Sequence, residues 1–69
     1  MKLSARNVID GTVTEIVKGA VTSHVRLDIG RTTITASITN EAVADPGLKV
    51  GEKASAVIKA TDVMIGIRD

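Results

Sequence analysis

The stretch VTSHVRLDIGRTTITASIT, residues 21–39, decides the fold class of this 69-residue chain. One face of a strand with period two is formed by Val21, Ser23, Val25, Leu27 and Ile29, and polar residues alternate with them, as in a strand with one buried face. A similar alternation returns over residues 33–39, and Gly30–Arg31 between the two runs predicts a tight hairpin turn. The stretch therefore predicts two neighbouring strands.

Strand patterns also precede and follow this hairpin. Residues 9–17 alternate with a slip of phase at Glu15, which predicts a β-bulge or a sharp bend. Residues 54–58 and 63–67 alternate again. Asn40 is a good N-cap for one short helix that ends at Asp45–Pro46–Gly47. Five strands, with one short helix between strands 3 and 4, predict an all-β fold. We expect a five-stranded Greek-key barrel of the OB type, in one domain over residues 1–69.

Composition indicates how such a small domain is stabilised. The chain has no cysteine and no aromatic residue, although 43% of its residues are hydrophobic. Disulfides and thiolate metal sites are therefore excluded, as are the large side chains that small cores usually contain. A chain of this length buries only about 60% of its unfolded surface. We expect the subunit to complete its core by associating with copies of itself.

Charge and residue types exclude several functions. The chain has nine Lys and Arg residues and eight Asp and Glu residues, and the two signs alternate along the sequence. Because no basic patch or run is present in the sequence, we expect no nucleic-acid or membrane partner. A base-stacking surface would need aromatic residues. The lone His24 lies on the polar face of a strand pattern, without a nearby Cys or a Ser in a strained turn, so no enzyme is expected. Without an apolar leader or a long apolar run, the expected location is cytoplasmic.

Two short segments differ from the rest of the chain. Ser4-Ala5-Arg6-Asn7 and Lys59-Ala60-Thr61 each combine one cation with hydroxyl or amide groups and small side chains, and neither contains a carboxylate. If they converge, they form the donor-rich pocket that a tetrahedral dianion requires. From composition alone, an exposed strand entry and an ordinary turn are the more common explanations of these two segments.

The order of four motifs resembles that of the molbindins, the small molybdenum–pterin-binding (Mop) proteins, which are similar to the TOBE-type domains of molybdate transporters and regulators. The motifs are residues 4–7, 16–19, 36–39 and 57–61. The resemblance implies an OB-like homohexamer, a trimer of dimers, that binds molybdate or tungstate between subunits and requires no organic cofactor. The implied oxyanion-binding residues are Ser4, Arg6, Asn7, Lys59, Ala60 and Thr61, with Thr39 from a neighbouring subunit. A second oxyanion site is implied at Lys18, Gly19, Ala20 and Val21.

Together these observations predict a cytoplasmic molybdate- or tungstate-binding protein that stores molybdenum for cofactor synthesis. The alternative is a structural or regulatory oligomerisation module that acts with a molybdate transporter or regulator. A nucleic-acid-binding OB domain is a third hypothesis, disfavoured by the missing aromatic residues and the net charge of +1.

Overall fold

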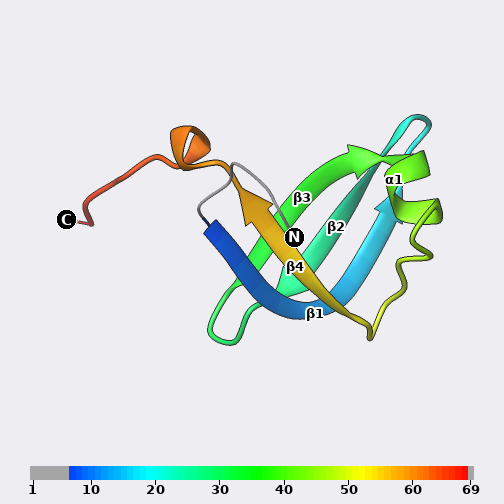
Figure 1. Cartoon of the computed structure of the whole chain (residues 1–69), viewed down its shortest axis with the longest axis horizontal. Helices are drawn as coiled ribbons and strands as arrows, with labels where there is room; N and C mark the ends of the chain where they lie inside the picture. Colours follow the sequence, from blue (N-terminus) through cyan, green and yellow to red (C-terminus); the bar gives the residue numbers. More distant parts are fainter. Residues whose placement is uncertain (1–6, 69) are drawn as a thin grey trace.

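The computed structural model describes residues 7–68. In it the chain forms one curled antiparallel sheet with a short helix (Figure 1). The strands are β1 (Asn7–Lys18), β2 (Thr22–Asp28), β3 (Thr33–Thr39) and β4 (Lys53–Ile58). The helix α1 (Asn40–Ala44) lies between β3 and β4, and a 3-10 turn, η1 (Ala60–Asp62), follows β4. The predicted all-β class and the position of the helix are confirmed.

The long strand β1 organises the sheet, whose strand order is β3-β2-β1-β4. Residues 7–12 of β1 pair with β4, and residues 12–18 pair with β2, in both cases antiparallel. Because the two halves of β1 have different neighbours, the strand bends and the sheet curls into half a barrel (Figure 1).

A bulge and a close approach shape the middle of β1. The register with β2 shifts between Val13 and Glu15, which confirms the bulge predicted from the slip of phase. Two residues earlier, a Cβ on Gly11 would lie 2.5 Å from the carbonyl oxygen of Asp28. A side chain at this position would collide with the backbone, so glycine lets β1 pass this close to the end of β2.

The core inside the curl is small. Among residues 7–68, the buried hydrophobic side chains are Val13, Val25 and Leu27. Partly buried side chains surround them: Ile16, Ile29, Ile38, Val43, Leu48, Ala54 and Ala56. The inward face predicted for Val25 and Leu27 is confirmed, whereas Val21 is 69% exposed because β2 begins only after it.

The helix begins one residue earlier than predicted. Thr39 is the N-cap, and its Oγ1 accepts a hydrogen bond of 3.2 Å from the N–H of Ala42. The prediction of Asn40 as N-cap was wrong because the Asn40 side chain is bonded to the β1–β2 turn instead. The predicted end of the helix is confirmed: Asp45 is the C-cap, and Gly47 takes the left-handed φ of 69° that ends the turn.

The predicted fifth strand is absent from the described residues. The chain beyond η1 runs away from the sheet (Figure 1), and Met64, Ile65 and Ile67 are 92%, 89% and 92% exposed. The prediction was wrong because a strand needs a hydrogen-bonded neighbour, and no described segment lies beside residues 63–68. The structure is therefore an open half barrel of four strands instead of a closed barrel of five.

Within residues 7–68, no helix has the length and apolar character to cross a membrane.

Candidate functional site

The ladder between β1 and β4 brings parts of the two predicted oxyanion-binding segments together. Asn7, the first residue of β1, pairs with Ile58, the last residue of β4. The Asn7 Nδ2 also donates a hydrogen bond of 3.2 Å to the Ile58 carbonyl oxygen. Asn7 is thereby held beside the start of Lys59–Thr61, and its amide nitrogen keeps a second hydrogen to donate. Ser4 and Arg6 lie outside the described residues.

The Lys59–Thr61 segment makes a tight turn with donor groups at its start. The N–H of Asp62 donates to the Lys59 carbonyl oxygen at 2.9 Å, and that of Val63 donates to the Ala60 carbonyl oxygen at 3.3 Å. The first N–H groups of such a turn have no partner inside it. Lys59, Ala60 and Thr61 are all exposed, so the N–H groups of the last two, the ammonium group and the hydroxyl are accessible to a ligand.

Thr39, the remaining predicted contact, lies at the opposite end of the sheet. It pairs with Thr22, next to the end of β1 that is farthest from Asn7 (Figure 1). Since β1 has 12 residues, the two ends are separated by roughly 35 Å of strand. One chain therefore does not bring Thr39 to Lys59. The Thr39 oxygen accepts from the N–H of Ala42, which leaves its hydroxyl hydrogen free for a ligand of another subunit.

The second predicted segment, Lys18–Val21, forms the turn between β1 and β2. The N–H of Gly19 closes this turn on the Thr22 carbonyl oxygen at 2.8 Å. A Cβ on Gly19 would lie 2.7 Å from the same oxygen, so this position requires glycine.

Sequence reasoning missed two polar residues that support this turn. The Asn40 Nδ2 donates to the Gly19 and Ala20 carbonyl oxygens at 3.1 and 3.3 Å, and the Ser23 hydroxyl donates to Asn40 Oδ1 at 2.6 Å. Ser23 is only 1% exposed. A serine on the inward face of a strand pattern was the available signal, because a buried hydroxyl requires a hydrogen-bonding partner.

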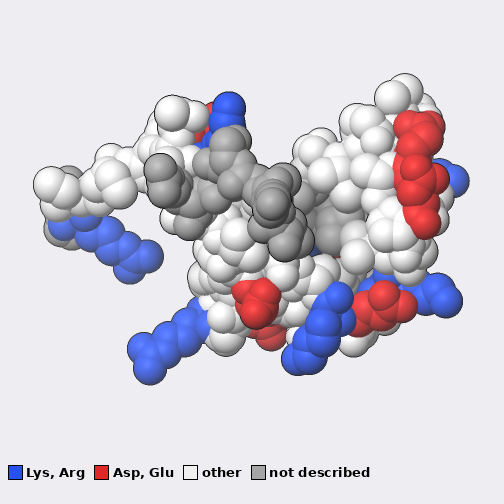
Figure 2. Space-filling view, viewed as in Figure 1, with Lys and Arg blue, Asp and Glu red and all other residues white. Residues whose placement is uncertain are grey.

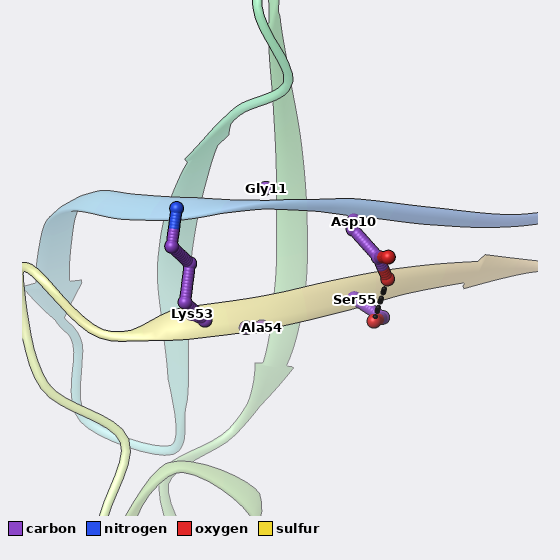
Figure 3. A pocket seen from close by; sticks show the side chains of 5 residues that line it. All are labelled: Asp10, Gly11, Lys53, Ala54 and Ser55. Atoms are coloured by element: carbon purple, nitrogen blue, oxygen red, sulfur yellow. Dashed lines mark hydrogen bonds between the residues drawn. The ribbon is translucent and has the colours of Figure 1, made fainter.

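A depression of about 540 Å³ lies on the outer face of β1 and β4 (Figure 3). Unlike the two predicted oxyanion-binding segments, it contains a carboxylate. Asp10, Gly11, Lys53, Ala54 and Ser55 line it. The Ser55 hydroxyl donates to Asp10 Oδ1 at 2.6 Å, and the Lys53 Nζ lies 3.3 Å from Thr12 Oγ1. The carboxylate would repel a dianion, so this depression does not suit an oxyanion.

Charges are mixed over the surface. On the face in Figure 2, acidic side chains gather over the end of the molecule that carries α1, whereas Lys and Arg side chains project separately around the rim. The ion pair between Arg26 and Glu15, at 3.3 Å, joins two exposed side chains. His24 is exposed on β2, and residues 7–68 contain no group of three His, Cys, Asp or Glu side chains placed to hold a metal ion.

Comparison with known proteins decides the family. The TOBE domain model matches residues 3–65. The chain belongs to the TOBE domain family. Its predicted resemblance to the small molybdenum–pterin-binding proteins is also confirmed. This TOBE domain is 44% identical over 68 residues to a probable molybdenum-pterin-binding protein of Haemophilus influenzae, covering 97% of this chain and 99% of that protein.

Solved structures agree with this assignment. A molybdate-binding protein from Sporomusa ovata matches with a TM-score of 0.93 and 42% identity, covering 97% of this TOBE domain and 100% of that chain. The cytoplasmic molybdate-binding protein ModG, crystallised with molybdate bound, matches with a TM-score of 0.92 and 51% identity. That match covers 99% of this chain and 49% of the ModG chain. These relatives are named as binding proteins.

Proposed function

We propose that this TOBE domain is a non-catalytic, cytoplasmic protein that binds molybdate or tungstate and stores the oxyanion for molybdenum-cofactor synthesis. The observation that carries the proposal is the pairing of Asn7 with Ile58, which places the entry to β1 beside Lys59–Thr61. The names of its relatives supply the ligand, since they bind molybdate or molybdenum–pterin.

The donor set suits a tetrahedral dianion. Molybdate offers only acceptor oxygens and carries no proton at neutral pH. We assign it to Ser4, Arg6, Asn7, Lys59, Ala60 and Thr61 of one subunit and Thr39 of another. A hydrogen bond to a charged partner contributes about 1.5–3 kcal/mol. Several such bonds, less the costs of desolvation and ordering, are sufficient for a binding free energy near −8 kcal/mol, about micromolar affinity.

The same donor set selects among oxyanions. Hydrogen phosphate carries a proton that needs an acceptor, and leaving that proton unpaired costs about 1–3 kcal/mol. Sulfate has no such proton, but it is smaller and cannot reach all the donors together. Tungstate matches molybdate in charge and nearly in size, so we expect the two to bind alike.

We also propose that the functional form is a homohexamer, a trimer of dimers. A groove of about 460 Å³ lies between β3 and β4 on the open side of the curl, and core side chains such as Val25, Leu27 and Ile38 line it. The largely apolar residues 63–67 run away from the sheet of their own chain (Figure 1). Their period-two pattern suits the strand missing from the groove of a second copy. Association also supplies Thr39, which one chain keeps far from Lys59.

Thermal unfolding with different anions tests the ligand assignment. At a hundredfold excess over its Kd, a ligand bound only by the native state stabilises it by roughly 2.7 kcal/mol. We expect molybdate and tungstate to raise the melting temperature clearly, and phosphate and sulfate to raise it little at equal ionic strength.

Two lysine variants provide the matched comparison for this test. Lys59→Ala should lose most of the molybdate shift. Lys53→Ala should keep it, because that ammonium lies on the outer face beside Thr12. Equal shifts from all four anions, or equal losses in both variants, would mean that the effect is ionic strength and not a shaped site.

A further inference from the structure

We propose that Asn40 is a positioning residue for the second oxyanion site: it holds the β1–β2 turn so that the N–H groups of Ala20 and Val21 point outward as donors. This inference rests on the proposed oxyanion-binding function. Asn40 itself does not touch the anion.

Asn40 binds three consecutive carbonyl oxygens of the turn. The Asn40 Nδ2 donates to the carbonyl oxygens of Gly19 and Ala20, at 3.1 and 3.3 Å. The Asn40 backbone N–H donates to the carbonyl oxygen of Val21 at 3.0 Å. All three acceptors therefore face α1. A turn of this kind would otherwise present some of its carbonyl oxygens, which repel anions, to the solvent.

The direction of the N–H groups follows from the planar peptide. In a trans peptide unit the carbonyl of one residue points opposite to the N–H of the next. The described chain has no cis peptide. Because the Gly19 and Ala20 carbonyls point at Asn40, the N–H groups of Ala20 and Val21 point away from it. Neither N–H donates to any acceptor within residues 7–68, and both residues are exposed.

Ser23 fixes which way the Asn40 amide faces. Its hydroxyl, on a side chain only 1% exposed, donates to Asn40 Oδ1 at 2.6 Å. The amide oxygen is thereby held toward Ser23, so the amide nitrogen must face the turn carbonyls. If the amide were reversed, its oxygen would oppose two carbonyl oxygens and the turn would open.

The result is a short surface of donors with a nearby cation. Two successive N–H groups pointing to the same side form an anion-binding concavity. Lys18, the residue that enters the turn, is exposed and supplies positive charge. The chemical class that this surface takes is a small dianionic oxyanion, the same class as at the first site.

Amide proton spectra of the full chain test the inference, with sodium molybdate as the probe. In the wild type we expect the amide protons of Ala20 and Val21 to move downfield and saturate, together with those of Ala60 and Thr61. In Asn40→Ala, which adds no charge, the Ala20 and Val21 shifts should disappear or require at least about tenfold more molybdate. The Ala60 and Thr61 shifts should persist. Ser37→Ala, an equally uncharged change on the exposed face of β3, is the matched control and should behave as the wild type.

The outcomes are distinguishable. If Ala60 and Thr61 respond in the wild type but Ala20 and Val21 do not, the inference is overturned and the proposed function stands. If no amide responds, the proposed function fails and the inference with it. Wild-type shifts of Ala20 and Val21 in Asn40→Ala would also overturn the inference. If that variant does not fold, Ser23→Ala, which keeps Asn40 but frees its amide, must show the same selective loss for the inference to hold.

Discussion

Replacing both Ile65 and Ile67 by serine should dissociate the assembly. These side chains are 89% and 92% exposed in the single chain, so nearly all of their apolar surface is available to a partner. Burying an isoleucine side chain completely contributes about 1.5–3 kcal/mol. The two isoleucine side chains of each subunit therefore contribute about 3–6 kcal/mol to the free energy of association. Losing that contribution weakens association by roughly two to four orders of magnitude.

Sedimentation velocity and light scattering across a dilution series measure this effect. The wild type should keep its oligomeric mass at micromolar concentration, whereas the double variant should shift toward the monomer and melt at a lower temperature. Val50→Ser is the matched control, because Val50 is 61% exposed in the turn before β4 and has no part in the proposed closure. An oligomer unchanged by the double substitution would refute the placement of residues 63–68 in the groove of a second copy.

Two further substitutions have definite expected outcomes. Gly11→Ala places a methyl group 2.5 Å from the Asp28 carbonyl oxygen, so the free energy of unfolding measured by chemical denaturation should fall by about 1–3 kcal/mol. The control Ser37→Ala, on the exposed face of β3, should lower it by less than about 0.5 kcal/mol. Arg6→Ala should weaken molybdate binding by about 2–5 kcal/mol in calorimetry, and with Lys59→Ala the double variant should lose less than the sum if both groups touch one anion.

Much of the sheet was predictable because it depends on local patterns. Val25 and Leu27 alternate with charged residues, and that alternation alone specifies which face of β2 is buried. The bulge before Glu15 was visible as a slip of phase, because a bulge adds one residue to one strand. Gly30 and Gly51 mark turns whose backbones take positive φ, where glycine is favoured.

The errors arose where long-range contacts decide the structure. The alternation of residues 63–67 indicates a strand, but no sequence pattern says which chain carries its neighbour. At the helix start, Asn40 has the right side chain for an N-cap, yet it binds Ser23 and the β1–β2 turn, so Thr39 takes the capping role. The sequence alone does not reveal the contact because 17 residues separate Asn40 from Ser23.

The candidate site was predictable in part for the same reasons. The composition of Lys59–Thr61 singled out a donor-rich turn, and the strand order then placed it beside Asn7. The contribution of Asn40 was not predictable, because it acts through the carbonyl oxygens of Gly19 and Ala20 and not through its own place in a motif.

Calorimetric titration of the assembled protein with molybdate is the most direct test of oxyanion binding. We expect saturable binding with a Kd of about micromolar or tighter, since several charge-assisted hydrogen bonds converge on one dianion. Tungstate should bind with a similar affinity, and sulfate and phosphate at least about fivefold more weakly, because an unpaired proton or a lost contact costs about 1 kcal/mol or more. The absence of saturable heat with molybdate, or equal affinities for all four anions, would contradict a shaped oxyanion site in this TOBE domain.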